Sequence, residues 1–209
     1  MSTISTYIKQ VQATLNHMPL EEIDRVIGVL YSAWESRRQV FIMGNGGSAS
    51  TASHFVCDLS KNTRVNGYNP FRVIGLTDNI ALMTAYGNDE GYENIFAQQL
   101  LPLVRPSDVV IGISTSGNSP NVLKAIEVAN NHGATTIGLT GFNGGKLSQM
   151  IDIELHVASD IIEQVEDIHL MLEHMICMDL KLRIENQHRS DSNSEEAVTE
   201  EYAQIVAGD

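Results

Sequence analysis

The chain has 209 residues, of which 43% are hydrophobic, and it carries a formal net charge of −13 with a pI near 4.8. That length and composition suffice for one substantial core, and the acidity argues against nucleic acid as a partner, because nucleic-acid binding requires a basic face. No hydrophobic run approaches the roughly 20 residues of a membrane span, and the first ten residues, MSTISTYIKQ, lack a signal-peptide pattern. Cys57 and Cys177 both fall in apolar helical patterns, which predicts buried thiols, a reducing compartment and a cytoplasmic protein.

Two helices are expected at the N-terminus, over residues 4–15 and 20–36, because apolar residues recur there every three or four positions. Pro19 suits the start of the second helix, so residues 1–37 are predicted to form a helical hairpin.

From Gln39 onward, short β-branched runs alternate with helical stretches. The predicted strands are residues 40–43, 72–77, 109–114, 135–140 and 151–157. Such runs, separated by helices, are typical of an α/β fold in which a parallel sheet is covered on both faces. A last long helix is expected from about Asp160 to Ile184.

The chain shows no internal repeat and no linker long enough to divide it, so residues 1–187 are predicted to form one domain. The segment 188–209 carries six acidic residues and one arginine. It is expected to be an acidic tail, solvated or loosely docked, whose simplest role is solubility.

A glycine-rich loop, GNGGS at 44–48, follows the first predicted strand. Its glycines allow a sharp turn and close approach to a ligand, and the helix after it offers free N–H groups to an anion. The candidate binding residues are Asn45, Gly46, Gly47 and Ser48. The spacing of Gly44, Gly46 and Ala49 also matches a dinucleotide fingerprint, for which Asp78 could supply the acidic residue.

A second polar loop, GISTSGNS at 112–119, follows the third predicted strand and favours a phosphate ligand over a dinucleotide. Ser119 and Pro120 suit the start of a helix, but that requirement does not explain three hydroxyl residues in a row, Ser114, Thr115 and Ser116. Hydroxyls at the carboxyl end of a central strand can form a neutral cage for a phosphate where open α/β sheets bind ligands.

His54 and Asp58 lie four residues apart on the helix after the first loop, so they share one face and have the spacing of two ligands to one metal ion. Such a pair is more often a solvated contact, but its place beside a phosphate loop favours the metal. The C-terminal helix carries a second cluster: Glu163, Glu166, Asp167, His169, Glu173 and His174. Of these, His169 is expected to be a packed histidine.

The two loops, together with GYENIF at 91–96 and GLTGFNGGKL at 138–147, resemble the sugar isomerase (SIS) domain family and, within it, the phosphoheptose isomerases. The resemblance implies a five-stranded parallel sheet and a homotetramer with active sites at subunit interfaces. The implied reaction converts sedoheptulose 7-phosphate to a heptose 7-phosphate through an enediol, with bound Zn²⁺. The family's phosphate-binding serines fall on Ser48, Ser114, Ser116 and Ser119, with Thr115 beside them, and a further polar position falls on Asp89.

By the same resemblance, the remaining metal positions fall on Glu166 and His174. Eight helical residues span about 12 Å, so one straight helix cannot easily direct both side chains at one ion. Either the helix begins after Glu166 or the two ligands come from different subunits, and the second alternative agrees with a site at an interface.

The sequence departs from the family at the reactive positions. Asp58 stands where the family has its catalytic glutamate, and Glu166 stands where it has a glutamine ligand, so either could be the base, with His174 as the general acid. The family's substrate-contacting arginine is not reproduced in place; Lys61 and Arg64 lie nearby. A non-catalytic SIS protein, acting as a phosphosugar sensor or a replication-initiation or regulatory scaffold, shares the loops but needs no base. A plausible ligand at all four metal positions favours the isomerase.

Overall fold

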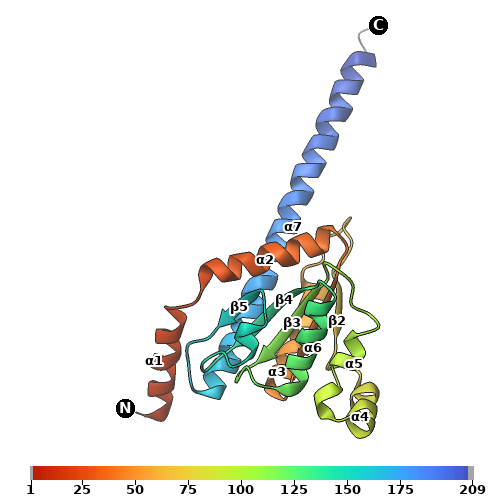
Figure 1. Cartoon of the computed structure of the whole chain (residues 1–209). Helices are drawn as coiled ribbons and strands as arrows, with labels where there is room; N and C mark the ends of the chain where they lie inside the picture. Colours follow the sequence, from red (N-terminus) through yellow and green to blue (C-terminus); the bar gives the residue numbers. More distant parts are fainter. Residues whose placement is uncertain (1, 207–209) are drawn as a thin grey trace.

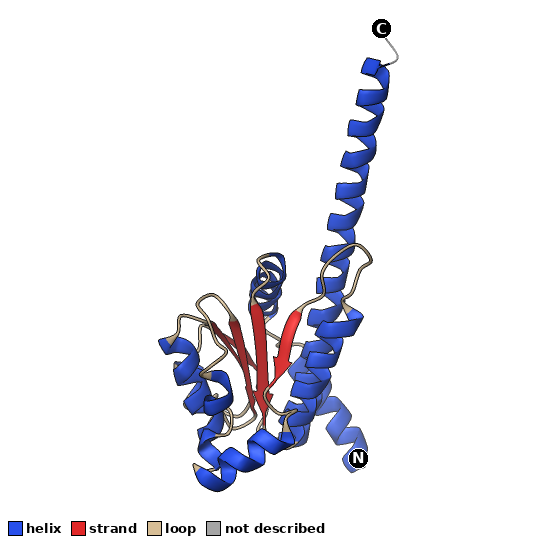
Figure 2. Cartoon of the chain, turned by 90° about the vertical axis from the view of Figure 1, so that its right-hand side faces the viewer, coloured by secondary structure: helices blue, strands red, loops and turns tan. Residues whose placement is uncertain are grey.

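Five parallel strands form the centre of the molecule, in the order β2-β1-β3-β4-β5 (Figures 1 and 2). The computed structural model describes the backbone of residues 2–206 and the side chains of residues 2–189. The strands are β1 (Gln39–Gly44), β2 (Arg72–Gly75), β3 (Val109–Ser114), β4 (Thr135–Thr140) and β5 (Ile153–His156). The predicted five-stranded parallel sheet is therefore confirmed.

Helices cover both faces of this sheet. They are α1 (Thr3–Leu15), α2 (Leu20–Glu35), α3 (Gly47–Cys57), α4 (Ile80–Asp89), α5 (Ala97–Leu100), α6 (Pro120–Asn131) and α7 (Ile162–Val206). Apolar residues of α2, α3 and α7 pack on one face, and those of α5 and α6 pack on the other. The runs of β1, β3 and β4 are hydrophobic because their side chains are buried on both faces.

The strand order reverses between β1 and β3, which pair directly from Val40 to Gly44. The chain leaves β1 toward β2 on one side and β3 toward β4 on the other. In open α/β sheets a crevice forms at this reversal, outside the carboxyl ends of the two strands. The two polar loops predicted to bind phosphate follow these same strands.

The predicted N-terminal hairpin is only partly correct. Both helices are present, but Figure 1 shows α1 turning away from α2 instead of folding back along it. Instead, α1 contacts the start of α7, where the Tyr7 hydroxyl donates to Asp167 and the Gln164 amide donates to Gln10 at 3.0 Å. No residue of α1 is fully buried: Leu15 packs against the core, whereas Ile4 and Ile8 are exposed.

The predicted end of the last helix at Ile184 is wrong, because the backbone of α7 stays helical to Val206 and extends well beyond the sheet (Figures 1 and 2). Between Ile184 and Val206 the sequence has no glycine or proline to stop a helix, and it includes two alanines and five glutamates, which favour one. The side chains of the predicted acidic tail from residue 190 onward lie outside the described residues.

Two further observations bear on the predictions from composition. Cys177 is buried, as expected, but Cys57 is exposed, and both are free thiols. Within the part of the chain that the structure describes, no helix combines the length and apolar character that crossing a bilayer requires.

Candidate active site

The first polar loop turns the chain from β1 into α3 at the crevice. Gly46 has a φ of 55°, a left-handed conformation that glycine adopts without strain, and it begins α3 without a side-chain cap. Ser48 in the first turn of the helix is buried. No side chain caps the first N–H groups of this helix, and the binding of an anion there stays a prediction.

Asn45 joins the first loop to the second. Its side-chain amide donates to Asn121 Oδ1 at 2.9 Å, and the Asn121 amide donates back to Asn45 Oδ1 at 2.8 Å. The Tyr92 hydroxyl also donates to Asn45 Oδ1, at 3.1 Å. These bonds hold the start of α3 against the start of α6, so the two loops lie side by side.

In the second loop, Ser119 lies at the N-cap position of α6, but its side chain does not cap the helix. Its hydroxyl lies 3.0 Å from that of buried Ser114. Ser116 Oγ accepts from the backbone N–H of Asn118 at 3.2 Å. A serine that pairs with another hydroxyl at a helix start, instead of with the helix, suits a site for an anion.

The second loop is held in place by the loop after β4. Thr115, which is buried, accepts from Gly141 N–H through its backbone carbonyl at 2.9 Å. Gly117 has a φ of 63°, and a Cβ there would lie 1.9 Å from the carbonyl oxygen of Gly144. The glycines of this region are therefore needed for loop packing.

Asp89, predicted to bind substrate, lies at the exposed end of α4, where its carboxylate accepts from the Asn88 amide at 2.7 Å. Within the described residues, no hydrogen bond or ion pair joins it to either loop. Asp78, the residue that a dinucleotide site would use, accepts from the Ser53 hydroxyl. Neither contact alters the prediction that the two loops bind phosphate.

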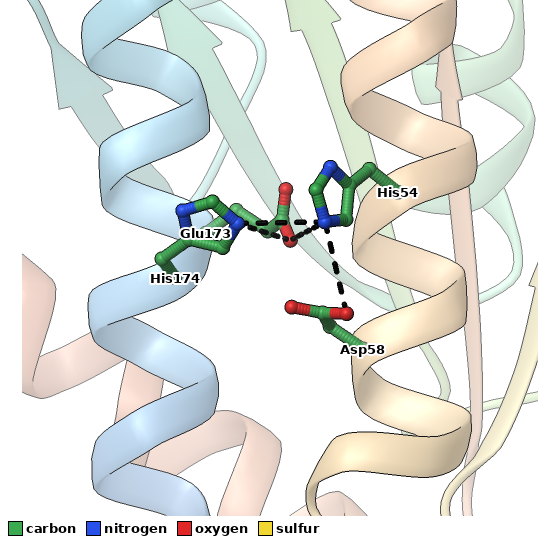
Figure 3. Close-up of side chains that lie close together, drawn as sticks. All are labelled: His54, Asp58, Glu173 and His174. Atoms are coloured by element: carbon green, nitrogen blue, oxygen red, sulfur yellow. Dashed lines mark hydrogen bonds and ion pairs between the residues drawn. The ribbon is translucent and has the colours of Figure 1, made fainter.

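A second polar group lies along α3, where it faces α7 (Figure 3). It comprises His54, Asp58, Glu173 and His174, each offering one ligand atom within 4.8 Å of the others. His54 Nε2 lies 3.4 Å from His174 Nε2 and 3.8 Å from Asp58 Oδ1. Asp58 begins a π-helical turn, Asp58–Asn62, and accepts from the Asn62 amide at 2.6 Å. Such turns within helices are frequent at functional sites.

The donor set and spacing fit a divalent metal ion. Imidazole nitrogens and carboxylate oxygens bind zinc at about 2.0–2.2 Å, which places tetrahedral ligands roughly 3.3–3.6 Å apart. The distances of 3.4 Å between the two Nε2 atoms and 3.8 Å from His54 Nε2 to Asp58 Oδ1 are therefore close to this arrangement. The structure brings together three of the four predicted ligands: His54, Asp58 and His174.

Glu173 belongs to this group although no role was predicted for it. Its side chain is fully buried, and neither carboxylate oxygen has a hydrogen-bond partner. Burial, and then the neighbouring charge of Asp58, raise the pKa of Glu173 to about 8. The sequence pattern could have indicated that Glu173 is buried, because it lies on a stripe of α7 that is otherwise apolar through Ile168, Leu172 and Ile176.

Glu166, the fourth predicted ligand, is not in this group. Because α7 begins at Ile162, the alternative in which the helix starts after Glu166 is excluded. Its carboxylate lies over the first phosphate loop, where both oxygens would be 2.4 Å from a Cβ placed on Gly47. Its role as a metal ligand stays a prediction that requires a second subunit.

A cavity of about 340 Å³ opens beside the cluster. It is lined by Asp58, Lys61, Asn62, Arg64, His174, Cys177, Met178 and Lys181. Lys61 and Arg64, the nearby substitutes for the family's arginine, therefore reach the edge of the site together with Lys181. Three cationic side chains of the cavity therefore lie beside the acidic polar cluster.

His169 is packed, as predicted from the sequence. It is fully buried, with Nε2 3.1 Å from the carbonyl oxygen of Thr140, and Nδ1 has no partner. Burial lowers the pKa of His169 to about 4, so the ring is neutral near pH 7. It holds α7 against the carboxyl end of β4.

Comparisons with known proteins show the family to which the chain belongs. The family model described as SIS domain matches residues 6–141. A phosphoheptose isomerase of Geotalea daltonii is 39% identical over 168 residues, which is 80% of this chain and 87% of that protein. A probable phosphoheptose isomerase of Thermoplasma acidophilum is 40% identical over 158 residues, 74% of this chain and 86% of that protein.

A solved structure shows the same fold. The phosphoheptose isomerase of Francisella tularensis superposes with a TM-score of 0.79 at 34% identity, covering 87% of this chain and 98% of that one. The similarity in fold therefore covers most of this chain and nearly all of that protein.

Proposed function

Because the chain belongs to the SIS domain family and, within it, to the phosphoheptose isomerases, we propose that it converts sedoheptulose 7-phosphate to a heptose 7-phosphate. The reaction moves a proton between adjacent carbons and so interconverts a ketose and an aldose through an enediol. It requires an anion site for the phosphate, a base near the carbon, and stabilisation of charge on the oxygens.

One observation supports this proposal: α3 begins at the phosphate loop, and its last turn, with the turn that follows it, presents His54 and Asp58 of the polar cluster. Ser48 and His54 are six residues apart, or about 9 Å along the helix axis. That separation is comparable to the length of an extended seven-carbon sugar phosphate. One substrate can thus reach both places, with its phosphate at the loops and its carbonyl end at the cluster.

The loops supply the phosphate site in this proposal. The proposed contacts are Asn45, Gly46, Gly47, Ser48, Ser114, Thr115, Ser116 and Ser119. Hydroxyls and helix N–H groups bind an anion without a fixed positive charge. They therefore bind phosphate and do not form ion pairs with the carboxylates of the polar cluster. Asp89, exposed at the end of α4, stays a prediction for the sugar hydroxyls.

We propose that His54, Asp58 and His174 hold a divalent ion, for which zinc is the expected metal. When bound, such an ion polarises the oxygens of the substrate and reduces the cost of negative charge on them. The Asn62 amide fixes the Asp58 carboxylate at 2.6 Å. One Nε2 atom cannot bind an ion and donate a proton at once, so the predicted role of His174 as general acid needs a separate test.

The base is a carboxylate, either Asp58 or Glu166. Asp58 is engaged by Asn62 and lies 3.8 Å from His54 Nε2, whereas Glu166 is half-buried over the phosphate loop. In the proposed pose Asp58 lies at the carbonyl end of the substrate, whereas Glu166 lies at its phosphate end, so Glu166 could take the proton from carbon only at the site of a second subunit. A sensor or scaffold would need neither group, so the cluster favours catalysis.

We further propose a homo-oligomer, a tetramer by analogy with the family, in the cytoplasm. Apolar side chains are exposed on the two helices that protrude from the sheet. They are Ile4 and Ile8 on α1, and Met171, Met178 and Leu182 on α7. Met178 also lines the cavity beside the cluster, so a second subunit packed there would border the active site.

The test compares sedoheptulose 7-phosphate, fructose 6-phosphate and unphosphorylated sedoheptulose as substrates of the Zn²⁺-loaded protein. We expect turnover of the first and little of the last, because the loops bind phosphate. Asp58→Asn and Glu166→Gln identify the base by the larger fall in kcat, and Glu127→Gln, at an exposed position of α6, is the control. Substrate binding by the wild type without turnover of any ketose phosphate would favour the sensor.

A further inference from the structure

Glu173 is a buried charge-bearing group without an explanation in the fold. It stands on the side of α7 that packs into the core, between apolar Leu172 and His174. No donor reaches either oxygen of its carboxylate. A buried, ionised carboxylate without partners is strongly destabilising, so such a group is either protonated or paired with a cation.

The atoms nearest to Glu173 are those of the polar cluster. Its Oε1 atom lies 3.9 Å from His54 Nε2 and 3.9 Å from His174 Nε2. Figure 3 shows this oxygen directed between the two rings, with Asp58 on the side of α3. The Glu173 side chain therefore extends from α7 into the polar cluster, although the apolar residues on the same side of α7 pack into the core.

The three distances define a position for an ion. The two Nε2 atoms are 3.4 Å apart, and with 3.9 Å on both other sides, one point lies about 2.2 Å from all three atoms. That value is close to the bond lengths of zinc to imidazole and carboxylate. Hydrogen bonds do not explain this spacing, because a carboxylate oxygen that accepted from an imidazole would lie nearer.

We propose that Glu173 is a ligand of the metal ion, so that the protein ligands of the ion all come from one subunit. The full set is His54, Asp58, Glu173 and His174. This inference rests on the proposed metal-dependent isomerase. It leaves Glu166, which lies over Gly47, without a role as a metal ligand in the site of a neighbouring subunit.

Two other arrangements compete with this one. In the first, Glu173 is a protonated acid beside Asp58 that only fills space. In the second, Glu166 of a neighbouring subunit is the further ligand. The three arrangements differ in which side chain the metal affinity depends on, and that can be measured without turnover.

The experiment measures Zn²⁺ affinity by competition with a chromophoric chelator, and the visible spectrum of the Co²⁺-substituted full-length protein. The variants are Glu173→Leu, Glu173→Gln and Glu166→Ala, with Glu163→Leu as a control at an exposed position of α7. Leucine matches the apolar stripe, and glutamine keeps the shape if leucine prevents folding. Alanine at position 166 removes every atom that could bind an ion.

We expect Glu173→Leu to lower Zn²⁺ affinity at least about 100-fold, because loss of outer-shell partners alone typically costs 10–100-fold. The Co²⁺ spectrum should change, Glu173→Gln should also bind more weakly, and Glu166→Ala should stay within about threefold of the wild type. A loss below about tenfold in both Glu173 variants, with an unchanged Co²⁺ spectrum, would overturn the proposal. So would a larger loss in Glu166→Ala.

These outcomes are separable from the proposed function. A wild type that binds Zn²⁺ through Glu173 but turns over no ketose phosphate contradicts the isomerase and leaves the ligand assignment intact. A wild type that is an active zinc isomerase, with unaltered affinity in Glu173→Leu, contradicts the ligand assignment alone.

Discussion

Buried His169 should make the protein lose stability in mild acid, and His169→Gln should remove that loss. In the folded protein the ring is neutral, with one nitrogen against the Thr140 carbonyl and the other without a partner. Protonation would place a charge in the core, next to His156 on β5. Glutamine retains an N–H donor for Thr140 but has no proton to gain in this range.

The size of the effect follows from the two pKa values. Burial lowers the pKa of His169 to about 4 in the folded protein, from an ordinary value of 6.5. The unfolded chain therefore takes up the proton first as the pH falls. The stability contributed by the neutral ring is complete above about pH 6.5 and is lost as the pH falls toward 4. At 1.36 kcal/mol for each pH unit, the loss is about 3 kcal/mol.

The assay is urea unfolding of metal-free wild type and His169→Gln between pH 8 and pH 4, at one protein concentration. Metal-free protein is used so that titration of metal ligands does not contribute through bound ion. At pH 8 the variant should have a lower free energy of unfolding than the wild type. Between pH 8 and pH 4 the free energy of unfolding of the variant, relative to that of the wild type, should rise by about 3 kcal/mol. His17→Gln, at an exposed position in the turn after α1, is the control. A difference between wild type and His169→Gln that is constant with pH would refute the reasoning.

Two further predictions concern the loops. Ser114→Ala should lower kcat/KM for the phosphorylated sugar by about 10–150-fold, because a hydrogen bond to a charged group is worth about 1.5–3 kcal/mol. A change below twofold in steady-state assays would show that Ser114 does not belong to the phosphate site. Gly117→Ala should lower the free energy of unfolding in urea by at least about 2 kcal/mol, because left-handed backbone costs about 1–2 kcal/mol and the new Cβ would lie 1.9 Å from the Gly144 oxygen. Gly28→Ala, in α2 with no atom within 4 Å of the new Cβ, should instead stabilise by about 0.5–1 kcal/mol, and equal effects at both positions would contradict the loop packing.

The sheet and its loops could be predicted from the sequence because the signals are local. Continuous β-branched runs such as 109–114 identify strands buried on both faces, and glycine with hydroxyl residues after such a run identifies an anion loop. The structure differs where the outcome depends on packing. The angle of α1 depends on α7, which the sequence pattern does not reveal. The end of α7 lacks a glycine or proline signal, so the helix continues beyond the predicted residue.

At the site, the His54–Asp58 pair could be predicted from its spacing on one helix, and His174 only from family resemblance. The place of Glu173 could not be predicted in the same way, because it depends on how α7 is rotated against α3. The apolar residues around it indicate burial, but only the tertiary contact shows which nitrogens its oxygen approaches. Glu166 illustrates the converse, since its place over Gly47 follows from where α7 begins.

The most direct test of the account is turnover of sedoheptulose 7-phosphate by the Zn²⁺-loaded protein in D₂O, followed by NMR. A base that takes a proton from C1 and returns one to C2 exchanges it with solvent, so we predict a heptose 7-phosphate carrying deuterium at C2. Absence of any aldose phosphate from protein with its metal content verified would contradict the proposed isomerase.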